Sequence, residues 1–155
     1  MLFCGINPGL RSAELGRHFA GPGNRFWAVL YRAGFTPLQL RPDQQRELVT
    51  WGLGITNLVT RPTARAQELS GAELRDGGRR LVTLATSHRP AYVAVVGLTA
   101  YRAAFDEPRA VVGPQQRRLG PADVWLLPNP SGLNARWTLP ALTEEFGRLR
   151  TMLDE

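Results

Sequence analysis

Two short loops in this sequence each join an asparagine to a proline, and they carry the side chains best suited to chemistry. Asn7 lies in residues 5–9 and Asn129 in residues 129–133, each directly after an apolar run. Asparagine, proline and glycine are common turn formers, so either loop alone is explained as a simple turn. Two such loops after equivalent apolar runs are more informative. An amide donates and accepts hydrogen bonds but cannot take up a proton as a carboxylate does, so Asn7 could position a water molecule without strongly activating it.

The composition excludes several kinds of catalysis. All 19 basic side chains are arginines, and the 13 acidic ones leave a formal net charge of +6. The absence of lysine excludes a Schiff-base nucleophile, a lysine general base and a phosphate-binding lysine. The single cysteine, Cys4, cannot form an internal disulfide or supply a four-thiolate cluster, and two histidines offer little for zinc. We therefore expect neither a metal nor another cofactor.

The elements that would position the two loops alternate between strand and helix patterns. Short apolar runs predict strands at residues 1–6, 54–59, 91–96 and 123–127. Apolar residues at helical spacing, with capping residues and prolines, predict helices within residues 24–34, 42–51, 70–90, 98–105 and 138–153. Ser70, with Glu73 three residues later, forms a capping box at the start of the third. A loop rich in glycine and arginine is expected before the first helix. The Gly77-Gly78 pair weakens the prediction of the third.

This alternation predicts an α/β fold, a three-layer sandwich with a short, mostly parallel central sheet flanked by helices. Residues 91–96 are almost entirely apolar, which is typical of a strand buried on both faces. At 155 residues we expect one domain, residues 1–155. Ligands of such sheets bind beyond the carboxyl ends of the strands, where both asparagine loops would lie.

Four blocks of sequence carry a resemblance to a known family. They are Gly-Ile-Asn-Pro-Gly at residues 5–9, His-Phe-Ala-Gly-Pro-Gly-Asn-Arg-Phe-Trp at 18–27, Gly-Ile-Thr-Asn at 54–57 and Asn-Pro-Ser-Gly-Leu at 129–133. In this order they resemble the mismatch-specific (G/U) uracil-DNA glycosylases, relatives of thymine-DNA glycosylase within the uracil-DNA glycosylase superfamily. The resemblance spans nearly the whole chain and implies a uracil-DNA glycosylase-like fold.

The activity that this resemblance implies is hydrolysis of the N-glycosidic bond of uracil, or of damaged pyrimidines such as ethenocytosine, mispaired with guanine. The nucleotide is flipped out of the duplex, and base removal initiates base excision repair. We expect a cytoplasmic monomer that joins the bacterial nucleoid when bound to its partner, double-stranded DNA. No apolar run reaches the roughly twenty residues of a membrane helix. Without lysine the usual side-chain imine with an abasic site cannot form, so we expect a monofunctional enzyme with no lyase activity.

The resemblance also implies roles for residues of the first loop and its surroundings. Asn7 would hold the attacking water as the catalytic residue. Backbone N–H groups near Ile6 and the amide of Asn129 would stabilise the oxygens of the departing base. Phe19 would stack on the flipped base, and Ser12 would lie beside C5 of that base, where it disfavours the methyl group of thymine. A steric filter of this kind is worth only about 1–3 kcal/mol, so the discrimination should be modest.

In the second loop, Leu133 resembles the side chain that wedges into the gap left by the flipped nucleotide. The backbone around Ser131 and Gly132 would meet the guanine left behind. The family places an arginine close behind this loop. Here two residues intervene before Arg136, so its match to that contact is displaced. A proline and Asn129 replace the histidine of strongly uracil-specific relatives, and we expect a less selective pocket.

At three further places this sequence departs from the family pattern, which limits how far the family's residue roles apply to it. Glu14 stands where the family has a small residue; a solvated surface position is the favoured interpretation, over repulsion of phosphate or a role as a base. Asn57 replaces a basic residue of some relatives and removes one phosphate contact. The chain starts directly on the first expected strand, where relatives have preceding residues, which leaves open whether a few N-terminal residues are missing.

The alternative function is a catalytically inert α/β module that binds nucleic acid or nucleotides through the same loops. Asn7 together with Phe19 and Leu133 favours catalysis, because an inert binder needs neither a water-holding amide nor a wedge. A dinucleotide-binding domain is excluded, since residues 5–9 lack the Gly-x-Gly-x-x-Gly spacing and place Pro8 in the turn. Five arginines follow the first two strand ends and predict DNA on that face: Arg11, Arg17, Arg25, Arg61 and Arg65.

Overall fold

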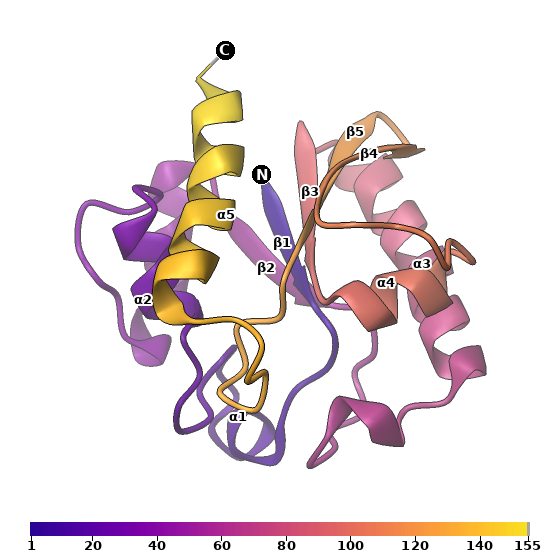
Figure 1. Cartoon of the computed structure of the whole chain (residues 1–155), viewed down its shortest axis with the longest axis horizontal. Coiled ribbons are helices and arrows are strands. Elements are labelled where there is room, and N and C mark those ends of the chain that lie inside the picture. The colour runs from indigo at the N-terminus through magenta and orange to yellow at the C-terminus, as the bar shows by residue number, and fades with distance from the viewer. Residues whose placement is uncertain (155) are drawn as a thin grey trace.

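A five-stranded sheet forms the centre of the computed structural model, which describes residues 1–154 (Figure 1). Its strands are β1 (Leu2–Gly5), β2 (Gly54–Asn57), β3 (Tyr92–Val96), β4 (Gly113–Leu119) and β5 (Ala122–Leu127). They lie in the order β2-β1-β3-β5-β4. All pairs are parallel except the last, in which β4 runs antiparallel to β5. The four predicted strands and the mostly parallel α/β sheet are confirmed.

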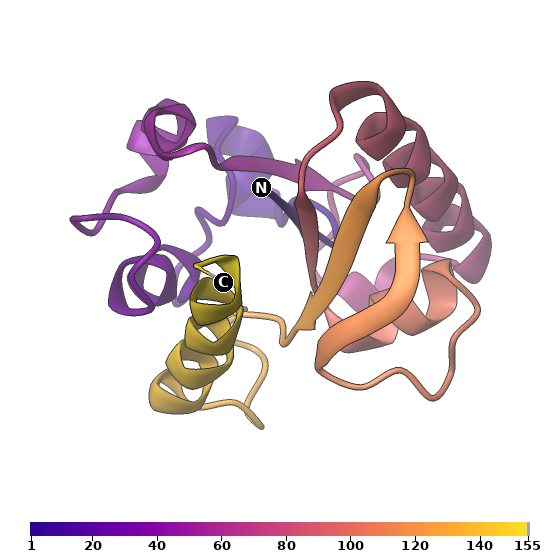
Figure 2. The same ribbon diagram turned by 90° about the horizontal axis from the view of Figure 1, so that it is seen from above.

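Helices cover both faces of this sheet, as the two views at right angles show (Figures 1 and 2). One face carries α3 (Gly71–His88) and α4 (Leu98–Ala104), and the other carries α2 (Phe26–Arg32) and α5 (Leu139–Leu153). These are the three layers expected from the alternating pattern. Within residues 1–154, none of the helices combines the length and the apolar character needed to span a bilayer.

The central strand β3 explains why two separate cores form. Val93 and Val95 belong to the core beneath α3 and α4, whereas Ala94 and Val96 belong to the core beneath α2 and α5. All four side chains are almost completely buried. Because successive residues of a strand point to opposite faces, an uninterrupted apolar run is what a strand covered on both sides requires.

Three elements, α1 (Leu10–Leu15), β4 and η2 (Ala66–Glu68), lie where no helix or strand was expected. The short helix α1 occupies part of the predicted glycine- and arginine-rich loop. The edge strand β4 has the sequence Gly-Pro-Gln-Gln-Arg-Arg-Leu, in which only the two end residues are buried. A strand with this polar composition gives no apolar signal, and it forms because the buried β5 beside it offers an unpaired edge. Residues 42–51 form a 3₁₀ helix, η1 (Pro42–Trp51), rather than an α-helix, and η2 is a further 3₁₀ turn.

The glycine pair in α3 is a packing requirement and does not interrupt the helix. The side chain of Ser70 caps the helix by accepting a hydrogen bond from Glu73 N, as its sequence predicted. A Cβ atom added at Gly77 would lie 2.3 Å from the carbonyl oxygen of Leu58, and one at Gly78 would lie 2.9 Å from that of Ala104. The pair therefore lets α3 approach the backbone of the segment after β2 and that of α4.

This close approach predicts opposite effects for two glycine-to-alanine changes within helices. Gly77→Ala should lower the free energy of unfolding by about 1–3 kcal/mol, because the new methyl group overpacks against backbone. Gly147→Ala in α5, where nothing lies within 4 Å of the added Cβ, should raise it by about 0.5–1 kcal/mol. Urea unfolding of both variants beside the unaltered protein measures the difference. Equal effects of the two changes would contradict this account of the α3 glycines.

Candidate active site

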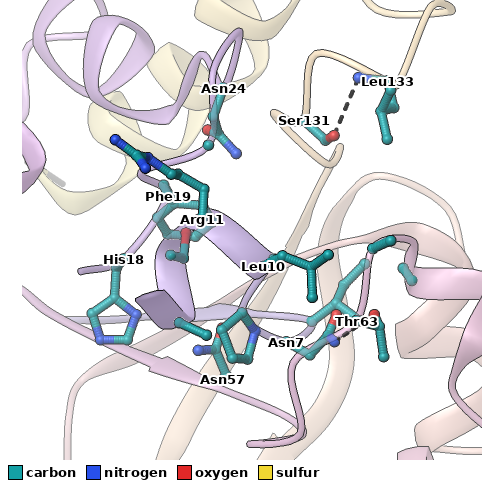
Figure 3. A pocket seen from close by; sticks show the side chains of 18 of the residues that line it. Asn7, Leu10, Arg11, His18, Phe19, Asn24, Asn57, Thr63, Ser131 and Leu133 are labelled. Atoms are coloured by element: carbon teal, nitrogen blue, oxygen red, sulfur yellow. Dashed lines mark hydrogen bonds between the residues drawn. The ribbon is translucent and has the colours of Figure 1, made fainter. Parts of the chain in front are cut away.

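The carboxyl ends of the parallel strands open into one cavity of about 840 Å³. Its walls come from residues 6–24, from residues 57–66 after β2, and from residues 129–133 after β5. The cavity brings together eight of the nine site residues expected from the sequence: Ile6, Asn7, Ser12, Phe19, Asn129, Ser131, Gly132 and Leu133. The ninth, Arg136, is exposed and lies outside the lining. Figure 3 shows Asn7 and Thr63 on one side of the cavity, with Ser131 and Leu133 on the opposite side.

The amide of Asn7 is fixed in a single orientation. Its Nδ2 atom donates to the carbonyl oxygen of Arg61 at 2.9 Å and to Oγ1 of Thr63 at 2.8 Å. A carbonyl oxygen only accepts hydrogen bonds, so the nitrogen of the amide must face Arg61. The Thr63 hydroxyl in turn donates to the carbonyl oxygen of Arg65. Both amide protons are used, and within residues 1–154 the Oδ1 atom has no donor, which leaves it as the acceptor that Asn7 offers to the cavity.

Phe19 forms part of the cavity wall and packs on the protein core. Its ring stacks on that of Phe26 with centroids 4.0 Å apart, and its backbone has a positive φ of 51°. Gly5, at the end of β1, lies close to the ring edge, since a Cβ atom there would be 3.2 Å from Cζ of Phe19. The ring is half-buried and contributes to the cavity lining. It therefore combines a core contact with a surface on which a planar ligand can stack.

Ser12 and His18 line the same side of the cavity. The Ser12 hydroxyl is buried and accepts a hydrogen bond from Ala20 N at 3.0 Å, which ties α1 to the segment carrying Phe19. The backbone of His18 is held by Gln45 and by the indole of Trp27. Burial lowers the pKa of the His18 imidazole below its usual value, because desolvation penalises the charged form. The cavity therefore contains a neutral imidazole at neutral pH.

The second asparagine loop is held by its own hydrogen bonds. Asn129 Oδ1 accepts from Ser131 N at 3.0 Å, and Ser131 Oγ accepts from Leu133 N at 3.2 Å (Figure 3). With its oxygen engaged by Ser131, the Asn129 amide offers its Nδ2 as a donor. Asn134 Nδ2 closes the loop on the carbonyl oxygen of Asn129. At the tip of the loop, Leu133 is 77% exposed, so an apolar residue is presented to solvent.

Asn57 is a cavity residue whose position the sequence interpretation did not anticipate. It ends β2 in register with Gly5, and its Oδ1 atom would lie 2.6 Å from a Cβ added to Gly5. Its amide lines the cavity beside Phe19, whereas the resemblance to the family indicates only a lost phosphate contact at this position. The available signal was its place at the carboxyl end of a parallel strand, where polar residues face the ligand site.

The five arginines expected to face DNA have different roles. Arg11, Arg17 and Arg65 line the cavity. Arg61 instead forms a bidentate ion pair with Glu73, with both distances at 3.0 Å, and this bond lowers the pKa of the Glu73 carboxyl.

Arg25 binds carbonyl oxygens of the second loop, whereas the Arg61 side chain is half exposed beside Glu73. Contact of the five arginines with DNA stays a prediction. Glu14 lies outside the cavity lining with 67% of its side chain exposed, and it pairs with Arg11 at 3.3 Å. The favoured interpretation of Glu14 as a solvated surface residue agrees with this placement.

The comparison with known families bears directly on this cavity. The sequence model of the uracil DNA glycosylase superfamily matches residues 1–150. The chain belongs to this superfamily. Membership supports a hydrolase of the glycosidase type, acting on uracil in DNA as part of DNA repair. The matched residues include both asparagine loops and every residue that lines the cavity, so the superfamily assignment and the geometry refer to the same site.

The lowered pKa of His18 predicts how stability depends on pH. Above the usual histidine pKa of about 6.5 the imidazole is neutral in both the folded and unfolded states and makes no difference. Below that value the unfolded chain takes up a proton that the folded protein resists, so the free energy of unfolding should decrease as the pH falls. Chemical denaturation across this range should show a smaller decrease for His18→Gln. An imidazole NMR titration that places the His18 midpoint above 6.5 would contradict the burial effect.

Proposed function

We propose that this protein is a monofunctional, mismatch-specific uracil-DNA glycosylase. It hydrolyses the N-glycosidic bond of uracil, and of damaged pyrimidines such as ethenocytosine, opposite guanine in duplex DNA. The observation that carries the proposal is the Asn7 amide, held by two hydrogen bonds so that its oxygen is offered to a cavity of base-accommodating size. The superfamily match over residues 1–150 supports the reaction class.

Asn7 suits a reaction in which bond cleavage runs ahead of water attack. The sugar then becomes an oxocarbenium-like cation, and the water needs positioning more than deprotonation. Asn7 Oδ1 can accept a hydrogen bond from this water, and the anchoring by Arg61 and Thr63 prevents the amide from rotating away. No carboxylate lies among the cavity-lining residues of the described chain, so a strong general base is absent from the proposed mechanism. Turnover is therefore slow and favours bases that leave readily.

A second group of residues stabilises the departing base. Asn129 Nδ2 donates to a base oxygen as negative charge develops, and the Asn57 amide in the cavity lining adds a second donor and acceptor. The Phe19 ring stacks on the base, a contact worth about 1–3 kcal/mol in nucleic-acid binders. Its position on Phe26 keeps the ring in place before the base arrives.

The rim of the cavity suits a duplex substrate. Leu133 fills the gap left by the flipped nucleotide, and Arg11, Arg17 and Arg65 contact phosphates around it. The protein acts as a monomer in this proposal. The reaction stops at base removal, because the chain has no lysine to form an imine with the abasic site.

A glycosylase assay tests the proposal directly. Duplex oligonucleotides carrying uracil opposite guanine, uracil opposite adenine, thymine opposite guanine or ethenocytosine are incubated with the protein, and abasic sites are detected by alkaline cleavage. We expect release from uracil opposite guanine and from ethenocytosine, slower release from the other two, and no strand cleavage without alkali. Duplex binding without abasic product from any substrate would leave the inert binding module as the function.

Asn7→Ala tests the catalytic role of Asn7 in this assay. The change should abolish base release while duplex affinity stays within about twofold, because Asn7 acts on the water and not on DNA phosphates. Gln116→Ala, which removes an exposed amide on the edge strand β4, should leave both properties unchanged. Parallel loss of binding and catalysis in Asn7→Ala would show that the residue is structural.

Leu133→Ala should weaken catalysis according to the strength of the base pair. We expect about a tenfold loss for uracil opposite guanine, since burial of a leucine side chain is worth about 1.5–3 kcal/mol. The loss should be small for uracil opposite an abasic site, where no pair has to be broken. Leu38→Ala, which shortens another exposed leucine outside the cavity, is the control. The same loss on both substrates would remove the wedge role.

A further inference from the structure

Arg25 makes an unusual set of contacts with the loop between β5 and α5. Its Nε donates to the carbonyl oxygen of Pro130 at 3.3 Å, and Nη2 donates to those of Ser131 at 2.8 Å and Asn134 at 3.2 Å. Nη1 donates to the carbonyl oxygen of Trp137. The backbone N–H of Arg25 adds a further bond to Pro130 O at 3.0 Å. One side chain therefore collects four carbonyl groups of the loop that presents Leu133.

The loop has short-range side-chain bonds through Asn129, Ser131 and Asn134, and the Arg25 guanidinium adds bonds from outside it. Its own backbone bonds are local and sparse: Asn134 N to Ser131 O, Ala135 N to Leu133 O, and Trp137 N to Asn134 O at 3.4 Å. Four carbonyl groups that converge on one point repel one another unless a donor with several N–H groups lies between them. The planar guanidinium supplies five such donors in fixed directions, and no carboxylate within residues 1–154 pairs with it.

Arg25 is itself anchored on the rigid part of the protein. It directly precedes α2, whose first residue, Phe26, is fully buried and carries the stacked ring of Phe19. The preceding segment touches the loop backbone to backbone, since a Cβ atom at Gly132 would lie 2.7 Å from Gly23 O. Arg25 thus connects the base-stacking side of the cavity to the opposite rim.

We infer that Arg25 is a positioning residue: it holds the Leu133 loop in the shape that enters the duplex, and it does not bind phosphate. The inference rests on the proposed glycosylase function. It assigns the effect of Arg25 to Leu133, so the loss caused by changing Arg25 must depend on whether Leu133 is present. It also assigns the effect to the geometry of the guanidinium rather than to its charge.

A double-mutant cycle tests this dependence. We measure single-turnover release of uracil opposite guanine for Arg25→Lys, Leu133→Ala and the combination. Each single change should slow release by about tenfold, and the combined variant should be no slower than Leu133→Ala alone by more than about twofold. A combined loss of about a hundredfold means that the two residues act independently and overturns the inference.

The lysine and glutamine variants separate geometry from charge. A lysine ammonium is a single point that cannot reach four carbonyl groups, so Arg25→Lys should lose nearly as much activity as Arg25→Gln. If Arg25 bound phosphate, Arg25→Lys would keep most of the activity and Arg25→Gln would bind DNA with a weaker salt dependence. Arg32→Lys, at the exposed end of α2, is the control and should match the unaltered protein.

Two further measurements distinguish an effect on the loop from a general folding defect. Uracil opposite an abasic site should be released at nearly the unaltered rate by Arg25→Lys, whereas an equal loss on both substrates shows a general folding defect and overturns the inference. Hydrogen exchange of the amides in residues 131–136 should accelerate in Arg25→Lys while α2 stays protected, and unchanged exchange also overturns it. If the unaltered protein releases no base from any duplex, the proposed function fails, and the exchange result alone decides whether Arg25 holds the loop.

Discussion

Parallel pairing aligns Gly5 with Asn57 and Cys4 with Val95, and this register positions every wall of the cavity. Because all strands of the central sheet except β4 run in the same direction, the segments that follow them emerge at one edge. The loop after β1 then lies against the loop after β2 closely enough for Asn7 to bond with Thr63. Buried β-branched residues on both faces of β3 stabilise this register, since a shift by one residue would exchange the two cores.

The sequence predicted the parts of the fold whose signal is local. Apolar runs located β1, β2, β3 and β5, and the Ser70 cap located the start of α3, because these patterns depend on neighbouring residues. The polar edge strand β4 and the short α1 lack such a pattern. The cavity lining was largely predictable as well, since loops after parallel strands must converge. The roles of Arg25 and Arg61 were not, because their partners lie 106 and 12 residues away, at Ser131 and Glu73.

A chain without lysine uses arginine for internal bonding as well as for surface charge. Arg25 organises one loop, and Arg61 both pairs with Glu73 and gives its carbonyl oxygen to Asn7. The guanidinium contacts of Arg25 and Arg61 use several donors in fixed directions, which a lysine cannot provide, whereas the carbonyl oxygen of Arg61 is a backbone group that any residue would supply. A basic residue that follows a strand end therefore either bonds within the protein or faces the cavity, and its place in the sequence does not distinguish the two. Of the five, Arg11, Arg17 and Arg65 line the cavity, and Arg11 also pairs with Glu14.

In the proposed enzyme, the cavity and the loop divide the work of catalysis. The cavity holds amides, a neutral imidazole and an aromatic ring, of which Asn7 is anchored by hydrogen bonds and Phe19 by stacking on Phe26. It can orient a water and a leaving base but cannot drive a proton transfer strongly. The exposed Leu133 and the loop that carries it offset the free energy needed to open the base pair. A pocket without a strong general acid or base then acts fastest on bases that are poorly paired and leave readily. In the proposed enzyme, a preference for mismatches and damaged pyrimidines follows from this division, to which contact of the loop backbone at Ser131 and Gly132 with the opposite guanine would add.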